Sequence, residues 1–270
     1  MDFQPTVAAA RAAMESLLSA RPRPLANESA TPEQRGEAHT LNAARNVRAR
    51  AAGVELRRQL TRFSRWMYRL GFAPGTSGNL SVRLDDARIL ATPTGCSKAL
   101  LRPVDMVIVD HAGHLLFGTR NVTSEIGMHL AVYRERPDVN AVVHAHPPVA
   151  TGFASCGLAL DAPLCAELIM TLGSIPLAPY ATTGTDEVGA SLQPFLRDHD
   201  AILMANHGLV TYGKDLLDAF MKMETCEHFA QVCLTAHQLG CRKLLEDDAL
   251  NKLQHARARY QANGHARFSD

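Results

Sequence analysis

The six residues from Val142 to Pro147 constrain this chain more than any other stretch, because they combine a buried strand with two histidines. Two valines precede His144-Ala145-His146, and Pro147 ends the run. Side chains two positions apart on a β-strand point to the same face of a sheet. His144 and His146 are therefore predicted to project together from one strand end, either as two ligands of one metal ion or as a pair of core residues.

The composition supports a globular core and argues against two classes of partner. The chain has 270 residues, of which 46% are hydrophobic, and its formal net charge is +1. This length suits one large domain or two small ones. A charge near zero predicts no nucleic-acid partner, and no apolar run approaches the ~20 residues of a transmembrane helix. The six cysteines include no C-x-x-C pair, so we expect reduced thiols in a cytoplasmic protein.

Helical and extended patterns alternate along the chain. Residues 1–40 are predicted to form an N-terminal helical extension and linker, and residues 41–270 the main domain. A helix is expected to end at Gly71, and the pattern then changes to a period of two. Strands are expected at 79–84, 88–92, 104–109, 115–117, 141–146, 175–178 and 201–204. A helix is expected after Thr123-Ser124-Glu125 and up to about residue 136, with Thr123 or Ser124 as its N-cap. Further helices are expected at 148–155, 185–196, 215–239 and after 246. This interleaving predicts an α/β domain with helices on both faces of a central sheet.

A third histidine, His207, follows another apolar strand, and Gly208 after it permits a close turn. Catalytic zinc sites usually take three protein ligands and leave one position open. A His-x-His strand and one histidine from a neighbouring strand would provide such a set. We assign the other histidines that lack this context, His129 among them, to the surface or to packing.

Glu125 opens the helix expected after Thr123 and Ser124. It is either a first-turn carboxylate that interacts with the helix dipole or a general acid/base beside a metal. Three loops of small residues also qualify as anion sites. They are Gly75-Thr76-Ser77-Gly78-Asn79, Thr92-Pro93-Thr94-Gly95 and the helix start at Thr123 and Ser124. Together these signals indicate a metal site next to a phosphate pocket.

Six motifs, in chain order, resemble the class II aldolase/adducin family, and the likeness is greatest to its L-fuculose-1-phosphate aldolase branch. They are residues 75–81 (GTSGNLS), 92–95 (TPTG), 124–125 (SE), 144–146 (HAH), 178–181 (APYA) and 206–208 (NHG). The resemblance covers roughly residues 50–240. It implies a three-layer α/β/α sandwich with a mainly antiparallel central sheet, and a homotetramer with active sites at subunit interfaces.

The same resemblance implies a role for each motif residue. One divalent metal ion per subunit, Zn²⁺ before Mn²⁺, Co²⁺ or Fe²⁺, would be held by His144, His146 and His207. Glu125 would be the catalytic acid/base, and Tyr260 matches a late tyrosine that reaches into a neighbouring subunit's site. The residues that would surround the substrate phosphate are Thr76, Asn79, Thr94, Gly95, Thr123 and Ser124. Cys165 and Thr183 replace two aromatic residues of the fuculose enzyme, so the aldehyde partner stays open.

The expected function is that of a metal-dependent aldolase, a lyase that reversibly cleaves a ketose or deoxyketose 1-phosphate to dihydroxyacetone phosphate and an aldehyde. The small phosphorylated sugar is the expected partner. Two alternatives use the same scaffold and metal, namely a dehydratase and a decarboxylase of an aromatic hydroxy-acid. The family's 4-epimerases typically carry Asp where Glu125 stands. A non-enzymatic interaction module similar to the adducin head domains would lack the three histidines.

Overall fold

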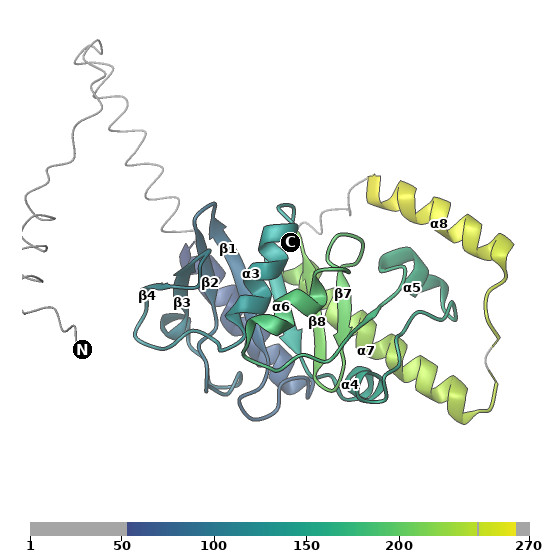
Figure 1. The fold of residues 1–270 in the computed structure, drawn as a ribbon, viewed down its shortest axis with the longest axis horizontal. Coiled ribbons are helices and arrows are strands. Elements are labelled where there is room, and N and C mark those ends of the chain that lie inside the picture. Colours follow the sequence, from purple (N-terminus) through teal and green to yellow (C-terminus); the bar gives the residue numbers. More distant parts are fainter. Residues whose placement is uncertain (1–52, 242, 263–270) are drawn as a thin grey trace, which may run out of the picture. The chain divides into compact units, whose positions relative to one another are not determined.

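The computed structural model describes residues 53–241 and 243–262, in which eight strands form one sheet (Figure 1). The strands are β1 (Asn79–Asp85), β2 (Arg88–Ala91), β3 (Val107–Asp110), β4 (Leu115–Phe117), β5 (Ala141–Ala145), β6 (Leu177–Ala178), β7 (Ala201–Met204) and β8 (Gly208–Gly213). Their order is β4-β3-β2-β1-β5-β8-β7-β6. All neighbours are antiparallel except β6 and β7.

Helices lie on both faces of this sheet (Figure 1). The described helices are residues 53–69, η1 (Pro103–Asp105), α3 (Ile126–Glu135), α4 (Pro148–Ser155), α5 (Ala166–Thr171), α6 (Asp186–Leu192), α7 (Leu216–Gln238) and α8 (Asp247–Ala262). Helix α8 lies apart from the sheet, next to α5 (Figure 1). None of the described helices is both long and apolar enough to cross a membrane.

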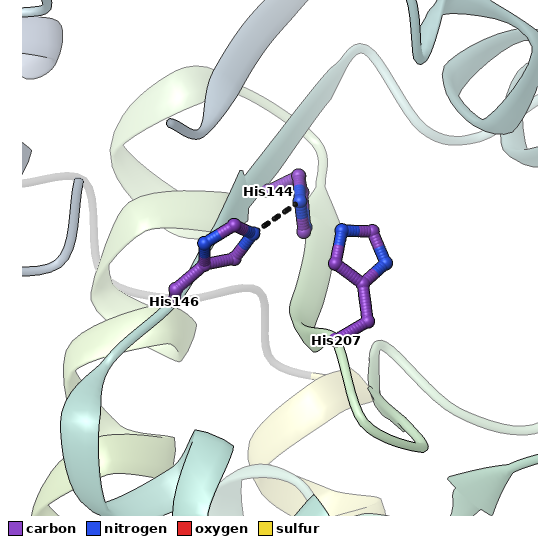
Figure 2. A group of neighbouring side chains, drawn as sticks. All are labelled: His144, His146 and His207. Carbon is purple, nitrogen blue, oxygen red and sulfur yellow. Dashed lines mark hydrogen bonds between the residues drawn. The ribbon is translucent and has the colours of Figure 1, made fainter. Parts of the chain in front are cut away.

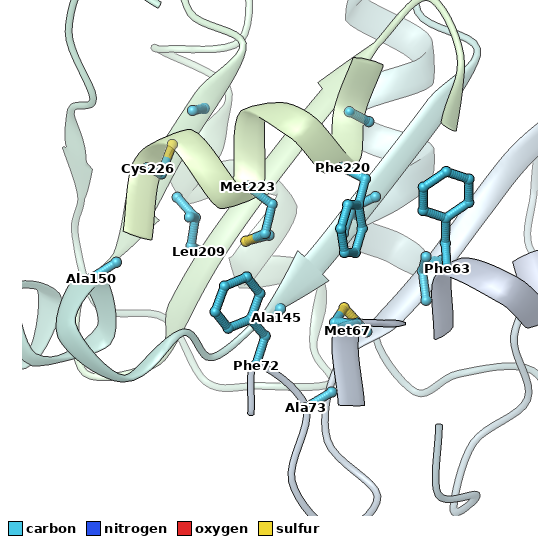
Figure 3. Packing of buried hydrophobic residues seen from close by; sticks show 14 of the residues in the cluster. Phe63, Met67, Phe72, Ala73, Ala145, Ala150, Leu209, Phe220, Met223 and Cys226 are labelled. Carbon is cyan, nitrogen blue, oxygen red and sulfur yellow. The ribbon is translucent and has the colours of Figure 1, made fainter. Parts of the chain in front are cut away.

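Strand β5 shows how the sheet separates two apolar layers. Val143 and Ala145 belong to a core shared with helix 53–69 and α7, whose Phe63, Met67, Phe220 and Met223 pack together in Figure 3. Val142 faces the opposite layer, which buries residues of α3 and α6. Alternation along the strand therefore sends its apolar side chains into both layers. The predicted α/β/α sandwich with a mainly antiparallel sheet is confirmed.

Several predicted boundaries are wrong. Residues 103–105 form a short 3₁₀ turn, so β3 begins only at Val107. Helix α3 begins at Ile126 with Glu125 at the N-cap, and no side chain caps it. Strand β8 and helix α5 were not predicted, because their short patterns depend on pairing and packing with distant segments. The predicted extension at residues 1–40 lies outside the described residues.

Candidate metal centre

The central strand β5 places the first two histidines. His144 stands opposite Asn79 of β1 and Val210 of β8, so it has a strand on each side. His146 follows the strand end, and its backbone N–H donates to Phe72 O over 2.8 Å. Both side chains lie on the α3 side of the sheet, as the period of two predicts.

The turn between β7 and β8 brings His207 to the same place. Asn206 adopts a left-handed conformation (φ 56°) in this turn, a region where Asn is enriched among non-glycine residues. Gly208 follows without a side chain, where a Cβ would lie 2.6 Å from Ala145 O and 2.6 Å from His146 Cδ2. The glycine thus lets the turn approach the end of β5 closely.

The three imidazoles converge (Figure 2). Their ring centroids are 4.7–5.2 Å apart, and one ring nitrogen of each lies within 4.8 Å of the others. The Nε2 atoms of His144 and His146 are 3.1 Å apart. His144 Nδ1–H donates to Leu209 O over 3.0 Å, which leaves its Nε2 lone pair directed at the cluster.

This donor set fits a divalent metal ion. In a tetrahedral zinc site with Zn–N bonds of ~2.0 Å, two ligand nitrogens are separated by roughly 3.3 Å, close to the separation of the His144 and His146 nitrogens. The backbone bond to His144 Nδ1 is the support that metal-bound histidines usually receive. Burial lowers the pKa of His144 to about 3 and also lowers the pKa of His146. These two imidazoles are therefore neutral at pH 7, as metal ligands must be.

Glu125 lies directly beside the three histidines. Its Oε1 is 3.1 Å from His207 Nε2, and its Oε2 is 3.4 Å from His144 Nε2. Burial raises the pKa of Glu125, but hydrogen bonds from His207 and Asn79 act in the opposite direction, and the pKa lies below its usual range. The side chain is therefore a carboxylate at neutral pH, in position to act as a base next to a metal.

Asn79 holds this carboxylate through a buried hydrogen-bond chain. Its Nδ2 donates to Glu125 Oε2 over 2.7 Å, and its Oδ1 accepts from His129 Nε2 over 2.5 Å. His129 Nδ1 then accepts from Ser81 Oγ, which accepts from Tyr133 O–H. Because the ionised carboxylate can only accept, Asn79 must donate to it through Nδ2 and accept from His129 through Oδ1. His129 then donates through Nε2, which leaves Nδ1 as the acceptor for Ser81. The chain therefore fixes the orientation of Glu125.

The three predicted anion loops meet at one place. The segment around Thr94 runs beside residues 121–123, with Thr94 N–H donating to Asn121 O and Thr123 N–H donating to Thr92 O. Thr76, Thr94, Gly95 and Ser124 are exposed at this place, whereas Thr123 is buried. The structure thus brings these candidate phosphate residues together. Asn79 differs from these residues in its contacts, because its amide group is already hydrogen-bonded to Glu125 and His129.

Two residues near the site were not assigned to it from the sequence. His129 was placed with the packing residues, yet it lies four positions after Glu125, a spacing that puts both on one helix face. Lys98 belongs to none of the sequence motifs described above. Its ammonium group joins two of the loops by donating to Thr76 O over 3.1 Å and to Cys96 O over 3.0 Å. Tyr260 belongs to α8, and its side chain lies outside the described part of the structure.

Comparison with known proteins gives a consistent result. The family model "Class II Aldolase and Adducin N-terminal domain" matches residues 58–234. The 5-deoxy-D-ribulose 1-phosphate aldolase of Bacillus thuringiensis serovar kurstaki is 34% identical over 199 residues, which cover 73% of this chain and 92% of that protein.

Two further relatives have different names. The 3-oxo-tetronate 4-phosphate decarboxylase of Escherichia coli K12 is 36% identical over 182 residues, which cover 66% of this chain and 85% of the relative. The crystal structure of L-fuculose-1-phosphate aldolase from Thermus thermophilus superposes with a TM-score of 0.61 at 31% identity, covering 74% of this chain and all of that one (100%).

Proposed function

The chain belongs to the class II aldolase and adducin family, and from this premise we propose that it is a metal-dependent aldolase. Its reaction would be the reversible cleavage of a ketose or deoxyketose 1-phosphate to dihydroxyacetone phosphate and an aldehyde. The observation that carries the proposal is the ionised Glu125 held within 3.4 Å of two of the three converging histidines. A carboxylate placed in this way serves a proton transfer beside a metal.

His144, His146 and His207 would hold the metal ion, for which we propose Zn²⁺ before Mn²⁺, Co²⁺ or Fe²⁺. When bound, such an ion supplies Lewis-acid polarisation of the substrate's carbonyl and hydroxyl oxygens. Glu125 would remove a proton from carbon 3 of dihydroxyacetone phosphate in the condensation direction. In the cleavage direction it would return that proton to the same carbon after the aldehyde leaves.

The loops at Thr76, Thr94, Gly95, Thr123 and Ser124 would hold the substrate phosphate, a group that does not react. Binding a remote group positions the reacting carbons and contributes to catalysis through orientation. A cavity of about 210 Å³ lies beside Glu125 and is lined in part by Ser124, Gly184 and Thr185. None of the three histidines lines this cavity, so the reacting atoms of the substrate would have to lie outside it.

The direct test is to incubate the metal-loaded protein with a panel of ketose 1-phosphates, including fuculose, 5-deoxyribulose and methylthioribulose 1-phosphates. Released dihydroxyacetone phosphate is detected by coupling to glycerol-3-phosphate dehydrogenase. Release from at least one substrate, at a rate about 10²–10⁴-fold lower with Glu125→Gln, is the expected result. No release from the whole panel by folded, metal-loaded protein would contradict the proposal.

A second candidate is a decarboxylase of a phosphorylated 3-oxo acid, which the 36% identity to the 3-oxo-tetronate 4-phosphate decarboxylase supports. The same arrangement serves both reactions, because losing carbon dioxide next to a carbonyl leaves electrons where aldol cleavage leaves them. Glu125 would then only supply a proton. This candidate predicts that the protein releases carbon dioxide from 3-oxo-tetronate 4-phosphate and releases no dihydroxyacetone phosphate from any ketose 1-phosphate. That result would favour it over the aldolase, the dehydratase and the aromatic-acid decarboxylase.

The proposal extends to the assembly. We propose a cytoplasmic homotetramer in which Tyr260 of one subunit approaches the site of its neighbour, as the family resemblance implies. The mass in solution, measured by light scattering, tests the assembly. Loss of activity in Tyr260→Phe with the tetramer intact would support the role of this tyrosine, and unchanged activity would remove it from the site.

A further inference from the structure

Lys98 is a buried cation for which the described part of the chain provides no acidic partner. The side chain is 1% exposed. Its ammonium group donates to the backbone carbonyls of Thr76 and Cys96, and none of the ion pairs among the described residues includes it. An ammonium group has three N–H donors, so two neutral carbonyls leave one donor unused and do not neutralise the positive charge.

Some partly buried cations of the described structure are neutralised directly, whereas Arg57 and Arg83 donate to backbone carbonyls, as Lys98 does. Arg136 pairs with Asp138 and Asp200, and Lys222 pairs with Asp200 and Asp218. A buried charge without such a partner is costly. Burial lowers the pKa of Lys98 to about 8, while Cys96 and Glu125 act in the opposite direction. Lys98 is thus protonated at pH 7, and the nearby Glu125 carboxylate favours this charge without forming an ion pair with it.

The two carbonyls that Lys98 contacts belong to the loops that present Thr76, Thr94 and Gly95 to solvent. A further cation near these loops, Arg120, is already paired with Asp105. The unpaired positive charge therefore lies directly behind the surface where the phosphate is proposed to bind. An anion bound to these loops would be attracted by the buried ammonium group, whose charge is screened by water less than the charge of an exposed lysine.

We propose that Lys98 provides the positive charge that makes these loops selective for a dianionic phosphate ester over an uncharged sugar. The inference rests on the proposed function, because it concerns the same substrate pocket, and it adds the residue that recognises the substrate class. Lys98 is a positioning residue. It acts through the two loops and through its charge, and it does not touch the reacting carbons.

A purely structural alternative is that Lys98 only ties the two loops together. A neutral donor could replace that function, because the partners are neutral carbonyls. Lys98→Gln keeps an N–H donor and removes the charge. The matched control is Lys214→Gln, which removes the same charge from an exposed lysine.

The test measures binding of ethyl phosphate by calorimetry, because this dianionic monoester lacks the carbonyl and hydroxyl groups that would chelate a metal. We expect the metal-loaded wild type to bind it and Lys98→Gln to bind it at least ten-fold more weakly. Lys214→Gln should change binding by less than two-fold. The KM for the ketose phosphate should rise in Lys98→Gln by more than kcat falls.

Equal binding of ethyl phosphate by folded, metal-loaded Lys98→Gln and wild type would overturn the proposal, as would no binding by the wild type. If Lys98→Gln does not fold, the Nζ resonance of Lys98 in lysine-labelled wild type replaces the variant. That resonance should shift when ethyl phosphate is added, and a fixed resonance during binding would overturn the proposal. Ethyl phosphate binding does not depend on which reaction follows, so failure of the aldolase assignment would appear separately.

Discussion

At the scale of single residues, the site combines neutral imidazoles with one carboxylate. Burial keeps His144 and His146 uncharged, and hydrogen bonds from His207 and Asn79 keep Glu125 ionised. His144 and His146 therefore need not lose protons to bind a metal ion at pH 7. The roles of ligand and base are separable, because His146 lies outside the hydrogen-bond chain that holds Glu125.

His146→Ala is expected to lose the metal, because it removes one of three ligands. Glu125→Gln is expected to retain the metal and to lower kcat by about 10²–10⁴-fold, the usual contribution of a general acid/base. Metal content by mass spectrometry of purified protein and steady-state kinetics measure the two effects. Equal loss of metal in both variants would contradict this division of roles.

His129→Ala is expected to lower kcat by about ten-fold while the metal stays bound. The substitution removes the donor that holds Asn79 Oδ1, and loss of a supporting hydrogen bond typically reduces activity by ~10–100-fold. The KM should change less than two-fold. His228→Ala, which alters an exposed histidine of α7, is the control. If kcat is the same in His129→Ala and the control, the hydrogen-bond chain does not position Glu125.

At the scale of elements, the centre depends on β5 and on the two segments that meet its end. The β7–β8 turn delivers His207, and α4 begins directly after Pro147. Glu227 of α7 fixes the start of α4 by accepting from Val149 N–H over 3.1 Å and Ala150 N–H over 2.8 Å. The histidines are thus attached to a sheet and to a helix start that are both held by buried hydrogen bonds.

Gly208→Ala is expected to weaken metal binding and to reduce the free energy of unfolding by about 1–3 kcal/mol, the range for overpacked sites. The added Cβ would lie 2.6 Å from both Ala145 O and His146 Cδ2, so the turn must move away from β5. Urea unfolding and metal titration measure the change. Gly152→Ala is the control, since its Cβ meets no atom within 4 Å and alanine favours a helix by ~1 kcal/mol. Similar destabilisation in both variants would contradict the steric argument.

At the scale of the whole molecule, buried neutral histidines connect stability to pH. Burial lowers the pKa of His129 from 6.5 to about 4, because the ring is enclosed between α3 and the sheet. The folded state therefore favours the neutral ring. Its stabilisation is fully present above pH 6.5 and is lost as the pH falls toward 4. His144, with a pKa of about 3, adds to this loss in the metal-free protein.

In metal-free protein, His129→Gln should therefore lose less stability than wild type between pH 7.5 and pH 4.5. One pKa unit corresponds to about 1.4 kcal/mol, so the difference between the two proteins should be on the order of 2 kcal/mol. Urea unfolding at both pH values in the presence of a chelator measures it. His228→Gln, the same substitution at an exposed position, should lose as much stability as wild type between these two pH values. If wild type loses no more stability than His129→Gln between these two pH values, the inference that His129 is buried in its neutral form is contradicted.

Much of the site could be predicted because its signals are local. Alternation along residues 141–146 places His144 and His146 on one face, and this depends only on strand geometry. The apolar run before His207 predicts a second strand end, and the six ordered motifs predict the family. The sheet and its layers also follow from local periods, although the start of β3, the start of α3 and the whole of β8 required the paired structure.

Local patterns in the sequence identify the donor types: three histidines at strand ends, a carboxylate at a helix start, and three loops of small residues. The contacts of those groups depend on the folded chain. Folding joins Asn79 to Glu125 and His129, and it buries Lys98 between two backbone carbonyls. The physical reason is that side-chain alternation is set within a strand, whereas burial and hydrogen-bond partners are set by segments distant in the chain. For example, the buried ammonium group of Lys98 donates to the carbonyl of Thr76, which lies 22 positions away in the sequence.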